Sequence, residues 1–79
     1  MKAKVMEIST ISHLSMKDGV PCDNYTATIS LRVVTQKAVL KYYYIVIRRT
    51  MVAVQKEIDR YELWETYDFD PAQLTKAGI

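Results

Sequence analysis

The stretch NYTATISLRVVTQKAVLKYYYIVIRR, residues 24–49, contains two strand-like segments separated by a short polar break. In residues 24–34, apolar side chains at the odd positions alternate with threonine, serine and arginine at the even positions. This period of two is typical of a half-buried β-strand. Residues 39–49 form a second, apolar and aromatic run, and TQKA (35–38) is the break between the two. The stretch therefore predicts a β-hairpin.

The register of this hairpin follows from its two patterns, because a slip of one residue would mix apolar and polar side chains on both faces. A loop of two or four residues centred on Gln36 and Lys37 avoids this mixing. One face then carries the pairs Val33–Leu40, Leu31–Tyr42, Ile29–Tyr44 and Ala27–Val46. The other face carries Arg32 opposite Lys41, Ser30 opposite Tyr43, Thr28 opposite Ile45 and Thr26 opposite Ile47, with Arg49 nearby. We expect the first face to be core.

Two segments precede the hairpin and have weaker patterns. Residues 3–12 are rich in β-branched residues and predict a first strand, whereas residues 13–23 contain a glycine and a proline and predict a loop. If the strand order in the sheet follows the chain, residues 39–49 lie at a sheet edge, which is a site of association between chains. Alternatively, the first strand returns to lie beside residues 39–49 and covers this edge.

The segment after the hairpin predicts an amphipathic helix over residues 50–67. Its apolar residues recur at spacings of three and four, and Thr50 is suited to be the N-cap. An alternative places strands at 51–56 and 61–69, where apolar residues also alternate. Near the end, Asp70 and Pro71 predict the start of a short helical turn that runs to Ala77 and is closed by Gly78.

The expected fold is therefore α+β and forms one small domain over residues 1–79. A three-stranded antiparallel sheet is packed by one amphipathic α-helix, and a short helical turn ends the chain. The alternative is a mostly-β small barrel with a fourth and a fifth strand at 51–56 and 61–69.

The residue types needed for catalysis are scarce in this sequence. It has one histidine, His13, one cysteine, Cys22, and two glycines, so a Gly-rich phosphate loop and an internal disulfide are excluded. A Cys22–His13 pair lacks an orienting third group, and the acidic residues between 62 and 70 match no metal-binding spacing. We expect no enzyme activity, no cofactor and no metal site. The lack of an apolar leader predicts a cytoplasmic protein that does not associate with membranes.

The charges are divided unevenly along the chain. Residues 1–50 hold eight Lys/Arg against three Asp/Glu, and residues 51–79 hold three Lys/Arg against six Asp/Glu, which gives +5 and −3. The basic part is suited to an anionic partner. Alternatively, the two parts attract each other within one fold.

The polar face of the hairpin is the candidate binding surface, formed by Arg32, Lys41, Tyr43, Ile45, Ile47 and Arg49. Arginine and tyrosine are frequent hot-spot residues in protein interfaces, and cations around an exposed ring also suit single-stranded nucleic acid. The plain alternative is that these residues only reflect β propensity and are covered by another segment.

We expect a small non-enzymatic binding protein that recognises another protein through this face or through the strand edge. Lone domains of this size often act as inhibitors or accessory regulators, and many examples are phage or mobile-element proteins, an association by class only. One alternative is a nucleic-acid-binding module that uses Tyr43 with Arg32, Lys41 and Arg49. Another is a structural subunit of a homo-oligomer, paired through the 39–49 strand edge.

Overall fold

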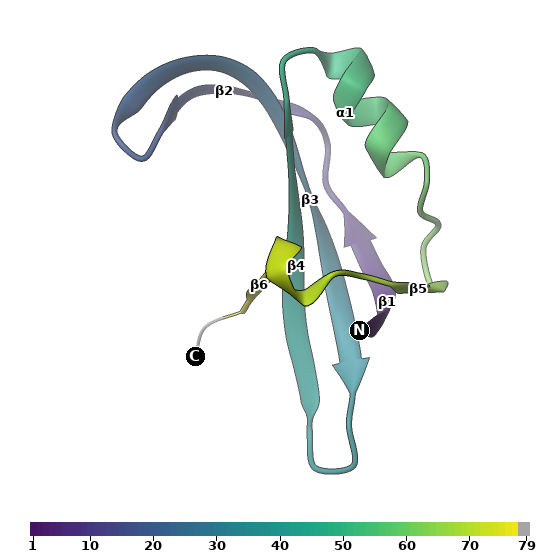
Figure 1. Ribbon diagram of the computed structural model, residues 1–79. Coiled ribbons are helices and arrows are strands. Elements are labelled where there is room, and N and C mark those ends of the chain that lie inside the picture. Colours follow the sequence, from purple (N-terminus) through teal and green to yellow (C-terminus); the bar gives the residue numbers. More distant parts are fainter. Residues whose placement is uncertain (78–79) are drawn as a thin grey trace.

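The computed structural model describes residues 1–77, which form an antiparallel sheet of six strands and one α-helix (Figure 1). The expected α+β class is confirmed. The strands are β1 (Lys2–Ile8), β2 (Ser12–Lys17), β3 (Val20–Val34), β4 (Val39–Arg48), β5 (Thr66–Asp68) and β6 (Leu74–Lys76), the α-helix is α1 (Met51–Ile58), and the 3-10 turn is η1 (Pro71–Gln73). The order in the sheet is β5-β1-β3-β4-β6, with β2 also paired to β3. Three strands are therefore too few, and the strand-rich alternative fits the sheet.

The predicted register of the β3–β4 hairpin is confirmed at every pair. Leu31 lies opposite Tyr42 and Ile29 opposite Tyr44, while Arg32 lies opposite Lys41. The four-residue loop is closed by the Thr35 N–H, which donates to the Ala38 carbonyl at 2.9 Å. Because this hydrogen bond joins Thr35 to Ala38, the odd-numbered residues of β3 and the even-numbered residues of β4 direct their backbone groups toward each other. The hairpin is the longest element of the molecule, and its loop projects beyond the sheet (Figure 1).

The loop predicted over residues 13–23 is wrong, because most of these residues belong to a second hairpin. β2 pairs with the first half of β3, and the two-residue connection is Asp18–Gly19. Both residues have positive φ, 54° and 78°, which matches the twist that tight hairpins favour. The predicted strand 3–12 is also divided, since β1 ends at Ile8 and β2 begins at Ser12. β2 and the start of β3 curve away from the rest of the sheet as an arm (Figure 1).

The predicted helix begins where expected but ends nine residues early. Thr50 is the N-cap, and its Oγ1 accepts from the Ala53 N–H at 3.1 Å. The helix ends at Ile58, after which the chain crosses to the edge of β1. There the Trp64 N–H donates to the Val5 carbonyl at 2.8 Å. The alternative strand at 61–69 is present only as β5, and the alternative strand at 51–56 is helical.

The end of the chain forms a strand where a longer helical turn was expected. Asp70 caps η1 by accepting from the Ala72 N–H at 3.0 Å, as its sequence predicts. The turn ends at Gln73 and continues as β6, which pairs with Tyr42–Tyr44 of β4. β4 is therefore not a free edge in that part, and the segment that covers it is not the first strand. The predicted closing residue, Gly78, lies outside the described residues.

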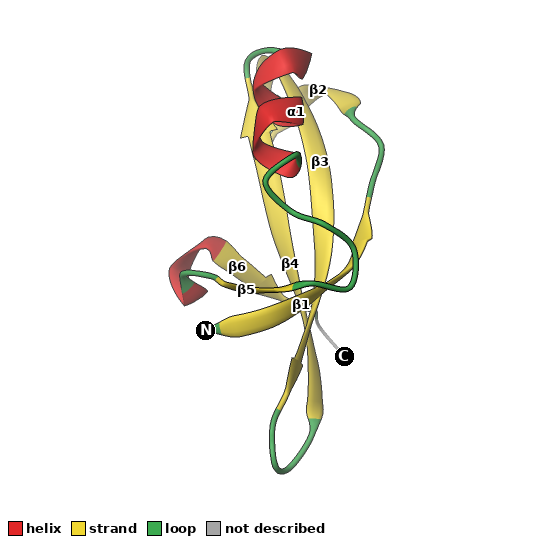
Figure 2. Ribbon diagram, turned by 90° about the vertical axis from the view of Figure 1, so that its right-hand side faces the viewer, coloured by secondary structure: helices red, strands yellow, loops and turns green. Residues whose placement is uncertain are grey.

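The core lies between α1 and one face of the sheet. It consists of Ala3, Val5, Ala27, Ile29, Leu31, Val46, Val54, Ile58 and Phe69. As expected, Tyr42 and Tyr44 pack against it, and the Tyr44 ring contacts those of Tyr61 and Phe69 edge to face. α1 lies beside the upper part of the long hairpin in Figure 1 and in front of it in Figure 2. No helix within residues 1–77 combines the length and the apolar character that crossing a bilayer requires.

Candidate binding face

Three cations lie side by side on the face of the sheet that points away from the core, here called the outer face. Lys4 of β1 lies opposite Arg32 of β3, which in turn lies opposite Lys41 of β4. Lys4 stands between the buried Ala3 and Val5, so its side chain points to the outer face. We call Lys4, Arg32 and Lys41 the cationic row.

The side chains of the cationic row are unpaired within residues 1–77. None of its three side chains forms an ion pair or a side-chain hydrogen bond with a described residue. Like charges directly opposite each other on neighbouring strands destabilise a sheet. The Nε–H of Arg32 is buried without an acceptor among the described residues, and an unsatisfied buried donor has its own cost. We therefore expect the three neighbouring positive charges to lower the stability of the free protein.

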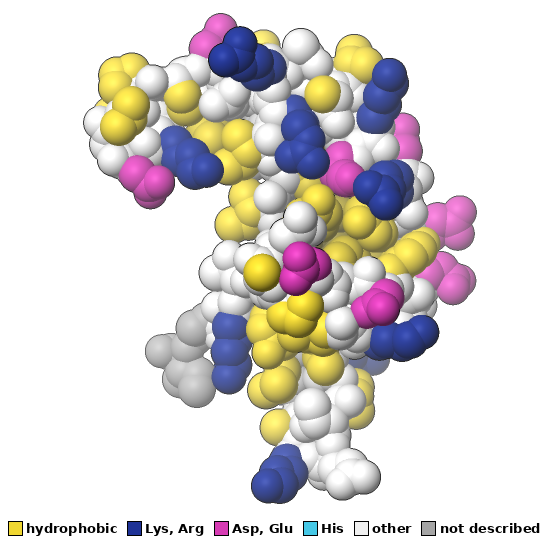
Figure 3. Space-filling view, in the orientation of Figure 1, with side chains coloured by type: hydrophobic (Ala, Val, Ile, Leu, Met, Phe, Trp, Pro, Cys, Tyr) yellow, Lys and Arg dark blue, Asp and Glu magenta, His cyan; other side chains and the backbone are white. Residues whose placement is uncertain are grey.

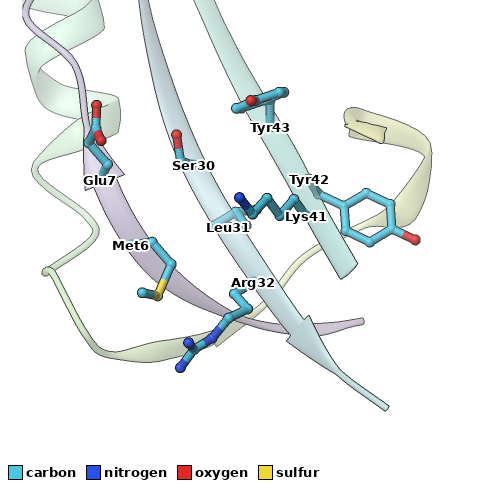
Figure 4. Close-up of a pocket in the computed structure, with 8 residues that line it drawn as sticks. All are labelled: Met6, Glu7, Ser30, Leu31, Arg32, Lys41, Tyr42 and Tyr43. Carbon is cyan, nitrogen blue, oxygen red and sulfur yellow. The ribbon is translucent and has the colours of Figure 1, made fainter. Parts of the chain in front are cut away.

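A hollow of about 360 Å³ adjoins the cationic row on the same face. Its central row is formed by Glu7 opposite Ser30, which lies opposite Tyr43. The hollow is lined by Met6, Glu7, Ser30, Leu31, Arg32, Lys41, Tyr42 and Tyr43. In Figure 4, Glu7 and Tyr43 stand on either side of Ser30, and the Lys41 side chain extends from β4 across β3. With Arg32, Lys41 and Glu7 in its lining, the hollow carries a net positive charge.

An exposed apolar strip continues from the hollow along β4. Tyr43 is 37% exposed and Ile45 is 45% exposed, and Ile47 is half-buried beside them. Their partners on β3 are Ser30, Thr28 and Thr26, whose short side chains leave the aliphatic groups uncovered. Aromatic and aliphatic side chains in an open position, with cations at the rim, form the arrangement found in protein interfaces.

Five of the six predicted binding residues lie on this face within β3 and β4, and Arg49 follows the end of β4. Arg32, Lys41, Tyr43, Ile45 and Ile47 follow one another over the outer face of β3 and β4. Arg49 lies eight residues beyond Lys41, ~26 Å away at the rise of an extended strand. It lines a separate hollow with Cys22, Asp23 and Asn24, where the arm begins.

Sequence reasoning missed the contribution of β1 to this face. Lys4 and Glu7 were not among the predicted residues, although they extend the cationic row and the hollow. The irregularity between Val5 and Glu7 shifts the register by one residue at Met6. An alternating pattern alone therefore cannot place Lys4 and Glu7 on the same face.

The open part of the β4 edge is short. The Lys41 carbonyl accepts from the Ala77 N–H at 2.9 Å, so the odd-numbered residues of β4 direct their backbone groups away from β3. β6 pairs with the edge from Tyr42 to Tyr44, which leaves Val39 at one end and Ile45 and Ile47 at the other. The guanidinium of Arg48 donates to the Ile47 carbonyl at 2.9 Å. Little of the predicted 39–49 edge therefore remains for pairing with a second chain.

The remaining candidates for chemistry are separated from one another. His13 Nε2 lies 2.7 Å from Asp23, whereas the Cys22 thiol donates to the Leu14 carbonyl at 3.4 Å. The two groups therefore bond to different partners and not to each other. Within residues 1–77, no three His, Cys, Asp or Glu side chains are grouped so that they could hold a metal ion.

Comparison of the chain with protein-family models, with curated proteins and with solved structures found no match.

Proposed function

We propose that the protein binds another protein through the outer face, and that the partner presents carboxylates beside an apolar side chain. The observation that carries this proposal is the cationic row, which forms no ion pair with a described residue and adjoins an exposed apolar strip. Such a module acts by occupying a surface of its partner, as a small inhibitor or accessory regulator in the cytoplasm does. No chemical step is needed for that role.

The chemistry of the hollow supports an acidic partner. A carboxylate is the natural acceptor for a guanidinium, and the pairing would relieve the repulsion between Arg32 and Lys41. Glu7 on the other side of the hollow would repel a carboxylate placed there, so the acidic group is expected next to the cationic row. An apolar side chain would cover Tyr43 and Ile45, where burial supplies most of the binding free energy.

Single-stranded nucleic acid is the second candidate partner, because the cationic row beside Tyr43 could hold a phosphate next to a stacked base. Two observations favour protein. Tyr43 is the only aromatic ring exposed on this face within residues 1–77, whereas strand-binding surfaces usually stack several bases. Ile45 and Ile47 extend the surface with aliphatic groups, which offer a base no polar contact.

Two matched peptides and one oligonucleotide test the proposal. The first peptide alternates glutamate and valine around a central tryptophan, the second has lysine in place of glutamate, and the oligonucleotide is a thymidine decamer. Each is titrated into isotope-labelled protein, and the backbone amide signals are followed by NMR. We expect the acidic peptide to shift the amides of Ser30, Tyr43 and Ile45, while the basic peptide leaves them unchanged.

Variants assign any binding to the face. Tyr43→Ala and Arg32→Gln should each weaken binding of the acidic peptide at least tenfold, which corresponds to ~1.4 kcal/mol. Val52→Ala, an exposed apolar position on α1, is the control and should bind normally. Binding of the oligonucleotide at these amides, without binding of the acidic peptide, would assign the face to nucleic acid and overturn the proposal.

A further inference from the structure

The turn between α1 and β5 presents an exposed tryptophan on a fixed backbone. Trp64 is 60% exposed and Leu63 is 48% exposed, although both are large apolar residues. The turn is closed by the Glu65 N–H, which donates to the Glu62 carbonyl at 3.3 Å. Two hydrogen bonds tie it to Val5 of β1, since the Trp64 N–H donates to the Val5 carbonyl and the Val5 N–H donates to the Glu65 carbonyl at 2.9 Å. The indole is therefore held out toward solvent.

Trp64 occupies a backbone conformation that suits glycine. Its φ is 72°, in the left-handed region where a side chain adds strain. The aromatic cluster beside it consists of Tyr44, Tyr61, Tyr67 and Phe69, and Trp64 makes no ring contact with it. A strained position that is filled by a large and mostly exposed side chain indicates a role outside the core.

The turn is also acidic, and its carboxylates are free. Glu62 and Glu65 flank Leu63 and Trp64, and neither side chain is paired with a described residue. The neighbouring Asp68 differs, because it holds the Met1 ammonium group at 2.7 Å. Figure 3 shows acidic side chains at the margin of the molecule along which the α1–β5 loop runs in Figure 1. The turn thus combines an apolar anchor with two negative charges.

This turn and the outer face have complementary chemistry on one chain. The outer face offers a hollow with a net positive charge beside an exposed apolar strip, and the turn offers carboxylates beside an indole. The turn lies at the β1 edge of the sheet, and no contact within the described residues brings it onto the outer face. Among residues 1–77, only the Met1 ammonium joins the basic part of the chain to the acidic part by an ion pair. The complementarity is therefore unused within one molecule.

We propose that the hollow of one molecule binds the Trp64 turn of a second copy. This inference rests on the proposed function, since it names the partner of the same face. The indole enters the hollow beside Tyr43, and Glu62 or Glu65 faces the cationic row. Because the two surfaces differ, the contact is head to tail, and each bound copy leaves one hollow and one turn free for the next. Rings or open chains result, rather than only pairs.

Sedimentation velocity over a dilution series tests this contact. The wild-type protein should show a weight-average mass that rises with concentration and falls when salt is raised from about 50 mM to about 500 mM. Trp64→Gly removes the indole and suits the backbone, and Lys41→Glu reverses a charge in the cationic row. Each variant alone should remain monomeric at concentrations where the wild type associates. Val52→Ala, the control outside both surfaces, should associate like the wild type.

Mixing the two variants gives the sharpest result. Trp64→Gly retains an intact hollow and Lys41→Glu retains an intact turn, so an equimolar mixture should form pairs and stop there. Association of Trp64→Gly alone to the wild-type extent, or a monomeric wild type at every concentration, overturns the inference. If the wild type is monomeric but the acidic peptide still shifts Tyr43, the proposed function stands and only the self-contact fails. If that peptide also fails to bind, the proposed function is lost as well.

Discussion

Arg32 lies directly opposite Lys41 on the neighbouring strand, and no carboxylate of the described chain pairs with either. A sheet position that faces solvent accepts many residue types, so stability does not require two cations there. Holding them together has a cost, and an acidic binding partner would offset it. The stability of the free protein and its capacity to bind should therefore respond in opposite directions to a change at this pair.

Replacing one cation of this pair should stabilise the fold. Lys41→Glu turns the repulsion with Arg32 into attraction, and we expect the free energy of unfolding to rise by about 0.5–1 kcal/mol. Urea denaturation at low salt measures the change. Lys41→Gln is the matched control, since it removes the charge without adding a new pair, and it should fall between the wild type and Lys41→Glu. A Lys41→Glu variant less stable than Lys41→Gln would show that the row is not under electrostatic strain.

The neighbouring tyrosines of β4 should differ strongly in their effect on stability. Tyr44 packs edge to face against Tyr61 and Phe69, so Tyr44→Ala should destabilise the fold by about 3 kcal/mol. Tyr43 lies on the outer face with its ring partly in solvent, and Tyr43→Ala should cost about 1 kcal/mol or less. Thermal unfolding followed by circular dichroism compares the two. Equal losses would mean that Tyr43 belongs to the core.

The strain at Trp64 can be measured by comparing two small residues. Trp64→Gly and Trp64→Ala both remove the indole, but only glycine adopts a φ of 72° without steric cost. We expect the glycine variant to be more stable than the alanine variant by about 1 kcal/mol. Chemical denaturation of both variants gives the difference. If alanine is equal or better, the turn has relaxed to another conformation and the strain is not imposed by the backbone.

Alkaline pH should weaken the aromatic cluster. Burial of the Tyr61 phenol, together with the negative charge of Glu57, raises the pKa of Tyr61 above its ordinary value. The unfolded chain therefore releases this proton first. The stability that the buried, protonated phenol contributes is complete below pH ~10, the ordinary pKa of tyrosine, and is lost as the pH rises from there through the raised pKa of folded Tyr61. The unfolding midpoint of Tyr61→Phe should fall less between mildly and strongly alkaline buffer than that of the wild type. Parallel curves for the two proteins would exclude Tyr61 as the responsible group.

The β3–β4 hairpin was predictable because its strands and its loop favour the same register. A period of two in both strands leaves one register that separates apolar from polar residues, and the four-residue loop agrees with it. The alternation alone is therefore enough to separate Tyr43 from Tyr42 and Tyr44. The same logic cannot place Lys4 and Glu7 on one face, because the irregularity between Val5 and Glu7 changes the alternation there.

The second hairpin was missed although Asp18-Gly19 is a common signal for a tight turn. The flanking residues lack clear alternation, and Pro21 argued against a strand. The structure accommodates Pro21 because odd-numbered residues of β3 direct their backbone toward β4, which ends opposite Tyr25. A proline beyond that point removes no hydrogen bond from the sheet.

The end of α1 could not be predicted from the local sequence, because it depends on contacts with β1. Residues 59–65 continue a helical spacing through Tyr61 and Trp64, but the edge of β1 needs backbone partners and obtains them from Trp64 and Glu65. Tyr61 then stacks on Phe69 with ring centroids 5.2 Å apart. Tertiary contacts of this kind outweigh a helical propensity that is worth only a few tenths of a kcal/mol per residue.

The hydrogen bond from Arg48 to the Ile47 carbonyl has a consequence for aggregation of the chain while it is being synthesised or is partly unfolded. The run from Tyr42 to Ile47 is apolar, has high β propensity and lacks charge, which is the composition of segments that seed amyloid fibrils. Arg48 places a guanidinium on the last open carbonyl of that run, so we expect it to act as a gatekeeper against fibril growth. Faster thioflavin T kinetics for Arg48→Ala than for Arg49→Ala would reveal this protection.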